Sequence, residues 1–271
     1  MVTSHSFEKL IKLYKLVTRS YRFKVVNQNI KKKKIKIFDV GCGSWFPRWK
    51  YWFPKCEYYG LDYSGPNKSF SIDYENIPSM NQFYDIDLNT LNFDEIPNKS
   101  FDIIVMGHVL EHLYNTRNVL IEIIKKLKPN GYLYIEFPSI QSIFLPSCSG
   151  TLNFFDDKSH QTIIDYRLLS NFLSKLGFEI IEDGIIKNYF NIFITPIKAL
   201  ISRIKRGYVG GGVFWDLKNF KAYSFLKKNP KLKSFPISET NDRFSLLIDR
   251  KKFKNYINKA LSKKIWKFFM R

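Results

Sequence analysis

A glycine-rich turn and a carboxylate lie at a spacing that suits a nucleoside ligand. Gly41 and Gly43 follow the apolar segment 35–40, where a strand must turn sharply, and glycine lets the backbone approach a ligand closely. Asp62 ends the next apolar segment, where a carboxylate can accept hydrogen bonds from both ribose hydroxyls. Phe46 stands where a dinucleotide fingerprint needs its third glycine, which argues against NAD and FAD.

Histidines supply the other reactive groups. His160 lies in the long segment 138–161, a natural cover for an acceptor substrate, and it is our candidate for a general base. A histidine just before a helix can also simply cap that helix. His108 and His112 are four residues apart, but Val109 follows His108, so the HExxH motif is absent and we assign no metal.

The elements that position these residues alternate between strands and helices. Apolar runs predict strands over 35–40, 57–62, 82–87, 101–106, 132–137 and 178–186, and apolar stripes predict helices over 115–127 and 166–176. Residues 243–250 form a further apolar run, the expected seventh and last strand. We therefore expect a doubly wound, Rossmann-like α/β fold with a seven-stranded, mostly parallel sheet and an antiparallel last strand.

Three parts of the chain do not follow the alternation of strands and helices. Residues 1–34 hold an amphipathic helix over 7–26, which we expect to cap the central domain of residues 35–250. Residues 188–241 break the alternation and form an expected insertion before the last strand, with a basic helix over 197–206. Residues 251–271 place eight basic residues and no acid around an apolar stripe, which predicts a basic amphipathic C-terminal helix.

Composition narrows the partners and the compartment. A net charge of +20 implies an anionic neighbour such as nucleic acid, a phospholipid surface or a phosphorylated substrate, although a lysine-rich proteome gives the same balance. Three cysteines without a CxxC pair predict neither a disulfide framework nor a zinc knuckle. Neither a signal peptide nor a membrane span is predicted, so we expect a cytoplasmic protein.

Several motifs occur together along the chain. They are Asp39-Val-Gly-Cys-Gly43, Tyr59-Gly-Leu-Asp62, Asp87-Leu88-Asn89, Phe101-Asp102, His108-Val-Leu-Glu-His-Leu113 and Leu127-Lys-Pro-Asn-Gly131. In this order and at these distances the chain resembles the class I S-adenosylmethionine-dependent methyltransferases, particularly the broad bacterial group that acts on small molecules and glycans. The resemblance covers residues 35–186 and the last strand.

The resemblance implies S-adenosylmethionine as the cofactor. The residues that it assigns to the cofactor site are Asp39, Gly41, Cys42, Gly43, Asp62, Tyr63, Asp87, Leu88, Gly107 and His108. By the same resemblance the two turn glycines would line the methionine portion, Asp62 would hold the ribose, and Asp87 would accept the adenine amino group. The family usually has Gly-Gly where this chain has Asn130-Gly131, and asparagine tolerates a positive φ.

The acceptor is the least determined part of the function. We expect methyl transfer to a small molecule: a sugar, or a nucleotide-linked or lipid-linked glycan intermediate. One alternative is an RNA methyltransferase, although neither an Asn/Asp-Pro-Pro-Tyr motif nor a Pro-Cys nucleophile occurs. Another is a catalytically silent, cofactor-binding adaptor at a membrane. The C-terminal helix would either lie on the inner, anionic membrane surface or dock on the domain. No pattern indicates the oligomeric state.

Overall fold

The computed structural model describes residues 20–30, 34–43, 46–63, 80–145, 153–186, 189–207, 221–232, 234, 236 and 244–247. Most of the expected helix over 7–26 and the whole C-terminal helix over 251–271 lie outside these residues. The first described helix, α2 (Tyr21–Asn29), runs past the predicted end at residue 26.

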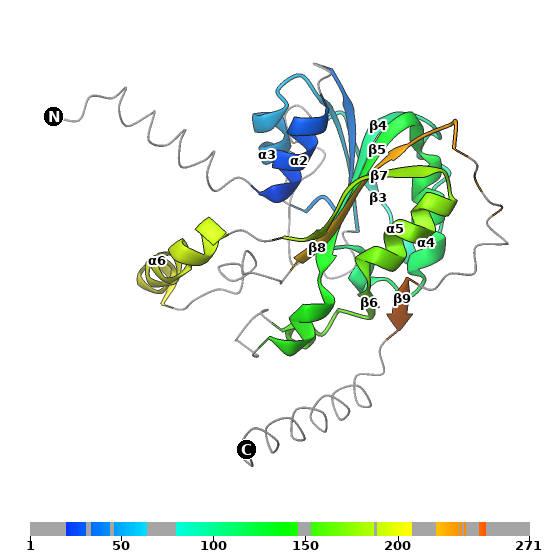
Figure 1. Ribbon diagram of the computed structural model, residues 1–271. Helices are drawn as coiled ribbons and strands as arrows, with labels where there is room; N and C mark the ends of the chain where they lie inside the picture. Colours follow the sequence, from blue (N-terminus) through cyan, green and yellow to red (C-terminus); the bar gives the residue numbers. More distant parts are fainter. Residues whose placement is uncertain are drawn as a thin grey trace, which may run out of the picture.

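A seven-stranded sheet forms the centre of the molecule (Figure 1). Its order is β3-β2-β1-β4-β5-β8-β7. The strands are β1 (Lys36–Val40), β2 (Glu57–Asp62), β3 (Gln82–Asp85), β4 (Phe101–Gly107), β5 (Leu127–Pro138), β7 (Phe178–Ile185) and β8 (Lys221–Lys228). Strands β1 to β5 pair in parallel, and β8 pairs antiparallel with both of its neighbours. The predicted Rossmann-like, mostly parallel sheet is therefore confirmed.

The last strand of this sheet is not where the apolar pattern placed it. The antiparallel strand β8 lies inside residues 188–241, which we expected to be an insertion. Within the predicted strand 243–250, β9 (Ser245–Leu247) pairs instead with β6 (Thr162–Ile164) in a separate two-stranded sheet. Both segments are short apolar runs beside basic residues, so periodicity could not decide which would pair between β5 and β7. In β8, Phe225 and Leu226 are fully buried there.

Helices cover both faces of the sheet (Figure 1). On one face α2 and α3 (Phe46–Trp52) pack against a core that includes Val26, Trp49 and Ile37. On the other face α4 (Thr116–Lys125) and α5 (Tyr166–Lys175) pack against a core that includes Phe38. Adjacent residues of β1 point to opposite faces, as the two-residue period of a strand requires. Both faces of β1 are thus apolar, which explains its continuous apolar run.

The turn expected at residues 128–131 lies inside the fifth strand rather than before it. Helix α4 ends at Lys125, two residues before its predicted end, and β5 begins already at Leu127. The pairing of β4 with β5 shifts register between Phe101 and Ile103, opposite this turn. Asn130 has a φ of 61°, so the expectation that asparagine adopts a positive φ here is confirmed.

A longer helix replaces the short one predicted in the insertion. Helix α6 (Tyr189–Arg206) includes residues 197–206 and continues two turns further toward the N-terminus, with Pro196 inside it. Figure 1 shows α6 away from the helices that cover the sheet. Within the described residues, none of the helices combines the length and the apolar character that a membrane span requires.

Candidate active site

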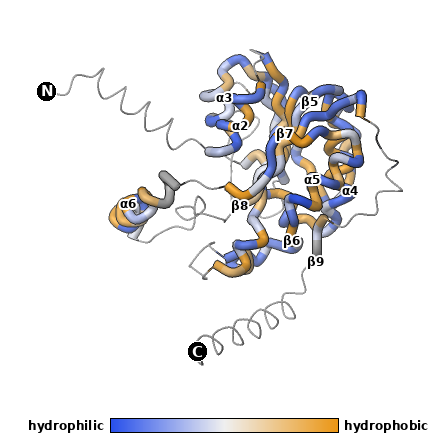
Figure 2. Tube along the Cα trace, viewed as in Figure 1, coloured by the Kyte–Doolittle hydropathy of each residue, from blue (hydrophilic) through white to orange (hydrophobic). Residues whose placement is uncertain are grey.

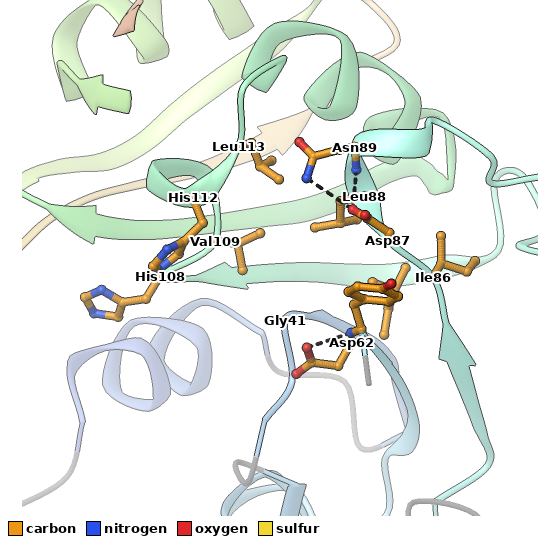
Figure 3. Close-up of a pocket in the computed structure, with 12 residues that line it drawn as sticks. Gly41, Asp62, Ile86, Asp87, Leu88, Asn89, His108, Val109, His112 and Leu113 are labelled. Atoms are coloured by element: carbon orange, nitrogen blue, oxygen red, sulfur yellow. Dashed lines mark hydrogen bonds between the residues drawn. The ribbon is translucent and has the colours of Figure 1, made fainter. Parts of the chain in front are cut away.

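A cavity of about 260 Å³ opens at the carboxyl ends of the parallel strands (Figure 3). It lies where the strand order reverses, with β2 on one side of β1 and β4 on the other, which is the usual ligand position in open α/β sheets. The described residues that line it are Gly41, Leu61, Asp62, Tyr63, Ile86, Asp87, Leu88, Asn89, His108, Val109, His112 and Leu113.

The turn after β1 requires glycine at its first position. Gly41 has a φ of 69°, and a Cβ atom there would lie only 2.3 Å from Val109 Cγ2, on the opposite side of the crevice. The amides of Gly41 and Cys42 both donate to the Leu61 carbonyl, at 2.7 and 3.0 Å. The backbone therefore turns tightly against the end of β2, and the absence of a side chain at Gly41 lets Val109 approach the turn closely.

Asp62 is held in place by the same turn. Its Oδ2 accepts the Gly43 amide at 2.8 Å, and its Oδ1 accepts the Tyr63 amide at 2.8 Å. Each oxygen of a carboxylate has two lone pairs, so both can still accept a hydroxyl from a ligand. Asp62 lines the cavity and can therefore hold the two hydroxyls of a ribose.

The other end of the cavity suits a flat base. Asp87 follows β3, and its Oδ1 accepts the backbone amide of Asn89 at 2.9 Å and its side-chain amide at 3.1 Å. The apolar side chains of Ile86, Leu88 and Leu113 line the same cavity. A carboxylate at an apolar wall suits a heteroaromatic ring with an amino group, so the residues present fit the adenosyl part of S-adenosylmethionine.

Four of the predicted cofactor residues are not among those that line the cavity. Gly43 contributes its amide to Asp62, as described above. Asp39 is buried beneath the turn, where it accepts Trp49 Nε1 at 2.8 Å and the Tyr58 hydroxyl at 2.9 Å. Cys42 is also fully buried, and burial raises the pKa of its thiol. The side chains of Asp39 and Cys42 are therefore buried inside the protein and do not face the cavity.

Gly107, the fourth of these residues, makes room for an arginine. A Cβ atom at Gly107 would lie 2.3 Å from Arg22 Nη2. This glycine was predicted to flank the cofactor, but its closest neighbour is the buried guanidinium from α2. Arg22 reaches Glu136 Oε1 at 3.2 Å, so the glycine lets a buried ion pair form.

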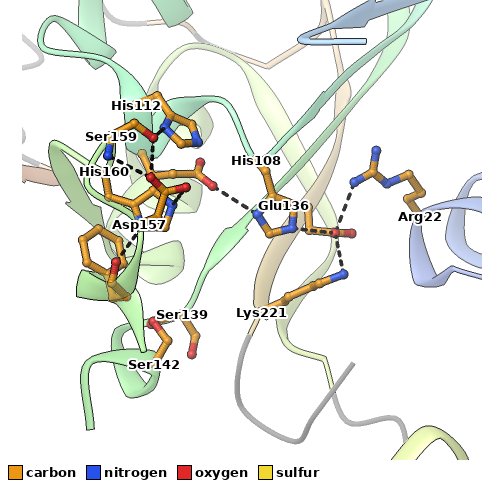
Figure 4. A network of polar contacts seen from close by, with 12 residues as sticks. Arg22, His108, His112, Glu136, Ser139, Ser142, Asp157, Ser159, His160 and Lys221 are labelled. Atoms are coloured by element: carbon orange, nitrogen blue, oxygen red, sulfur yellow. Dashed lines mark hydrogen bonds and ion pairs between the residues drawn. The ribbon is translucent and has the colours of Figure 1, made fainter. Parts of the chain in front are cut away.

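Glu136, on β5, is the centre of a buried polar network (Figure 4). Its Oε1 lies 3.2 Å from Arg22 and 3.3 Å from Lys221 Nζ, and its Oε2 accepts the Tyr134 hydroxyl at 2.7 Å. Burial acts to raise the pKa of Glu136, but the charges of Lys221 and Arg22 outweigh it and hold the pKa well below its usual value. Glu136 is therefore a carboxylate, neutralised by residues from α2 and β8.

His108 lies between two carboxylates and has a left-handed backbone, with a φ of 59°. Its Nδ1 is 3.1 Å from Glu111 Oε1, and its Nε2 is 3.3 Å from Glu136 Oε1. Burial acts to lower the pKa of His108, but the hydrogen bonds with Glu111 and Glu136 raise it above the usual value. A protonated imidazole linking two carboxylates is suited to positioning a ligand rather than to accepting a proton.

His160 is close to the cavity but does not line it. It is buried, its Nδ1 lies 2.7 Å from the Phe154 carbonyl, and its ring centroid is 4.9 Å from that of His112. The helix that follows is capped by Asp165, whose side chain accepts the Arg167 amide at 2.8 Å, so the helix-cap interpretation of His160 is wrong. Burial lowers the pKa of His160, which favours its neutral form.

His112 is the main residue that sequence reasoning missed. No role was assigned to His112 from the sequence, whereas the structure places it at the cavity, on the short 3-10 helix η2 (Leu110–His112) that follows β4. Asn89 and Val109 also line the cavity and were not predicted. All three lie in motifs that we had noted, and Asn89 and Val109 directly follow the predicted residues Leu88 and His108.

Residues 15–183, more than half of the chain, match the profile of the methyltransferase domain family, and the chain belongs to that family. Three solved structures share the fold. A methyltransferase from Mesorhizobium loti is 16% identical over 78% of this chain and 99% of its own, with a TM-score of 0.54. A phosphoethanolamine N-methyltransferase 2 from Haemonchus contortus is 14% identical. The match covers 84% of this chain and 58% of that protein, and its TM-score is also 0.54.

The third solved structure is a [4+2]-cyclase, SpnF, which is 16% identical over 77% of this chain and 80% of its own, with a TM-score of 0.51. These likenesses concern the fold, and the cyclase shows that the fold hosts more than one reaction. No curated protein sequence matches the chain.

Family and cavity together define the activity. The chain is a methyltransferase that uses S-adenosylmethionine, and Asp62 and Asp87 are the two carboxylates that line its cavity. When bound, the cofactor supplies a methyl group on a positively charged sulfur. The protein must then exclude water and align the acceptor with that group.

Proposed function

We propose that this methyltransferase acts on a small molecule, and that its acceptor is a hydroxyl group of a sugar in a nucleotide-linked or lipid-linked glycan intermediate. The observation that carries the proposal is the charge of the cavity. Two carboxylates, Asp62 and Asp87, line it, and none of its described lining residues is lysine or arginine. A nucleic acid passing this opening would meet like charge, which disfavours RNA as the acceptor.

Exposed aromatic side chains near the cavity support a sugar acceptor. Tyr63 lines the cavity and is 54% exposed, and Tyr114, which follows the lining residue Leu113, is 64% exposed. Tyrosine offers an apolar ring face together with a polar hydroxyl, and a sugar ring likewise has C–H faces and a hydroxyl edge. Aromatic groups of this kind can orient a sugar without burying a charge.

The exposed face of α6 supports a lipid-linked form of the acceptor. Phe193, Ile197, Leu200, Ile201 and Ile204 lie on one side of this helix, and each is at least 47% exposed. Figure 2 shows this apolar stripe as orange on α6. An amphipathic helix with an exposed apolar face and with Lys198 and Arg203 among its polar residues suits the surface of an anionic membrane.

The acceptor is tested by incubating the full-length protein with methyl-labelled S-adenosylmethionine. Three fractions are supplied in parallel: nucleotide sugars, lipid-linked glycans and total RNA from one bacterial extract. We expect label in a glycan fraction, at a methyl ether that mass spectrometry locates. Label in the RNA alone would overturn the proposal. Cofactor binding without labelling of any fraction would favour the silent adaptor.

The cofactor site is tested by the substitution Asp62→Asn. The amide keeps one acceptor but loses the charge that strengthens hydrogen bonds to the ribose, a difference of about 1.5–3 kcal/mol. We expect calorimetric titration to give a dissociation constant for S-adenosylmethionine weakened by roughly tenfold or more. Asp94→Asn, at an exposed carboxylate that does not line the cavity, is the control and should bind as the wild type does. Equal affinity of Asp62→Asn and the wild type would mean that the ribose lies elsewhere.

A further inference from the structure

Three potential metal ligands meet beside the cofactor cavity. They are Glu111 and His112 of η2 and His160 from the segment before β6, and one ligand atom of each lies within 4.8 Å of the others. Figure 4 shows the side chains of His112 and His160 close together, with Asp157 and Ser159 beside them. The ligands come from two segments almost 50 positions apart, which is why no local sequence pattern predicted a metal site.

The carboxylate of Glu111 has an unsatisfied oxygen. Glu111 is 1% exposed, and its Oε1 faces His108 Nδ1, but its Oε2 is buried without a hydrogen-bond partner among the residues that the structure describes. A buried carboxylate oxygen without a partner is costly, and a bound cation would satisfy it.

His112 presents its lone pair on Nε2. The Ser159 hydroxyl has one hydrogen and donates it to Asp157 Oδ1. The contact of 2.9 Å between Ser159 Oγ and His112 Nδ1 must therefore be donated by the ring nitrogen. This places the proton of a neutral His112 on Nδ1 and the lone pair on Nε2, the arrangement in which a second hydrogen bond orients a histidine ligand.

His160 is oriented in the same way. Its Nδ1 lies 2.7 Å from the Phe154 carbonyl, which can only accept, so the proton of the neutral ring is on Nδ1 and the lone pair is on Nε2. Asp157 Oδ2 lies 3.7 Å from that Nε2 and adds negative charge around it. A histidine whose Nδ1 donates to a backbone carbonyl is a common form of metal ligand.

Two hydrogen bonds hold the ligand-bearing segments together. The Gln161 amide donates to the Glu111 carbonyl at 2.7 Å, and the Thr162 hydroxyl donates to the Leu113 carbonyl at 2.6 Å. These bonds lie on either side of the three potential ligands, so the backbone holds the two ligand-bearing segments at a fixed separation. Ligand atoms about 2.1 Å from a tetrahedral ion are about 3.4 Å apart. The side chains, whose ligand atoms now lie within 4.8 Å of one another, therefore need to close by up to about 1.4 Å on binding.

We propose that Glu111 Oε2, His112 Nε2 and His160 Nε2 bind one divalent transition-metal ion at the edge of the cofactor cavity. Two imidazoles and one carboxylate favour zinc, iron or manganese over magnesium or calcium, which prefer oxygen ligands alone. His108 is not a ligand, because its two nitrogens face Glu111 and Glu136. Three protein ligands leave coordination positions open for a substrate.

The open positions give the ion a role in substrate binding. His112 lines the cavity, so the ion would lie between the cofactor and the segment that leads to His160. An acceptor hydroxyl bound to the ion would be oriented and made more acidic, which suits a sugar that lacks an acidic proton. This role rests on the proposed function, whereas the metal site itself does not.

The site is tested with metal-free protein and Co²⁺ as the probe. We expect one equivalent of Co²⁺ to give visible absorption bands of a nitrogen- and oxygen-bound ion, and Zn²⁺ to displace it. Glu111→Gln and His112→Asn should each weaken binding by about 100-fold, since loss of a supporting residue alone costs 10–100-fold. Glu122→Gln, at an exposed glutamate of α4, is the matched control and should bind as the wild type does.

Nitrogen NMR of the wild type tests the site without relying on the fold of any variant. Zn²⁺ should shift the Nε2 resonances of His112 and His160 and leave both Nδ1 atoms protonated. Unshifted histidine resonances, or variants that bind Co²⁺ like the wild type, would overturn the proposal. Calorimetry with S-adenosylmethionine on the same samples separates the two hypotheses. Failure of metal binding alone leaves the methyltransferase assignment intact, and metal binding without glycan labelling overturns only the proposed acceptor.

Discussion

Two buried carboxylates show how the neighbours of a residue decide its charge. Glu136 lies beside Arg22 and Lys221, which hold its pKa well below the usual value. Asp39 receives neutral donors from Trp49 and Tyr58, and burial raises its pKa to about 7 although Arg22 and these donors oppose the shift. Its Oδ1 is buried without a hydrogen-bond partner among the described residues, as suits a protonated carboxyl group.

Asp39 should make the stability of the protein depend on pH. The folded state keeps the proton up to about pH 7, whereas the unfolded chain releases it near pH 4. The unfolded state therefore binds fewer protons in this window, and the free energy of unfolding should fall as the pH rises, by about 4 kcal/mol in total.

Asp39→Asn should remove that decline. Urea unfolding at several pH values should give a difference between wild type and variant that changes steadily from pH 4 to pH 7. The exposed Asp94→Asn variant should follow the wild type at every pH. Parallel curves for wild type and Asp39→Asn would show that Asp39 is ionised in the folded protein.

At the scale of elements, the Glu136 network joins three segments that are distant in sequence. Arg22 comes from α2, Glu136 from β5 and Lys221 from β8, and all three are buried. Arg22 and Lys221 are almost 200 positions apart along the chain, so only the packing of the sheet brings both to the Glu136 carboxylate. Gly107 permits this meeting, because any larger side chain would occupy the space of the Arg22 guanidinium.

Glu136→Gln should destabilise the fold strongly. It leaves two buried cations without their shared carboxylate, a change that costs about 3–5 kcal/mol when one partner of a buried pair is removed. Chemical unfolding at pH 7 measures the loss. Glu122→Gln removes an exposed charge near Lys125 and should change stability by less than about 1 kcal/mol. A loss below about 1 kcal/mol for Glu136→Gln as well would contradict a cooperative network.

At the scale of the whole molecule, α6 presents the most extensive exposed apolar stripe of the described helices. Phe193 is 81% exposed and Ile204 is 75% exposed, although both are large apolar residues. Burying such side chains in a lipid interface gains about 1.5–3 kcal/mol each. Contact with a membrane would bring the catalytic domain near a lipid-linked acceptor, as the proposed function requires.

Replacing the stripe should weaken membrane binding. We expect the double variant Ile197→Asp, Ile204→Asp to bind vesicles of anionic phospholipid at least about tenfold more weakly than the wild type in sedimentation experiments. The variant Asn27→Asp, Gln28→Glu adds the same charge at exposed positions of α2 and serves as the control. Equal losses in both variants would mean that net charge, rather than the apolar face, drives binding.

Features that depend on residues close together along the chain could be predicted before the structure was known. The glycine turn at Gly41, the carboxylate of Asp62 at a strand end and the alternation of strands and helices all follow from local steric and periodic rules. They were enough to predict the fold class, and the resemblance of the ordered motifs to a known family predicted the cofactor.

Contacts between residues that are distant along the chain could not be predicted, because they depend on how the elements pack. Strand β8, rather than residues 243–250, completes the sheet, because two similar apolar runs compete and burial between β5 and β7 selects one. Asp39 and Asp62 are both aspartates near a strand end, yet only Asp62 lines the cavity. The direction of each side chain depends on its exact position in the strand, which the sequence pattern does not specify. Glu111, His112 and His160 likewise converge only through contacts between η2 and the segment before β6, which no local pattern records.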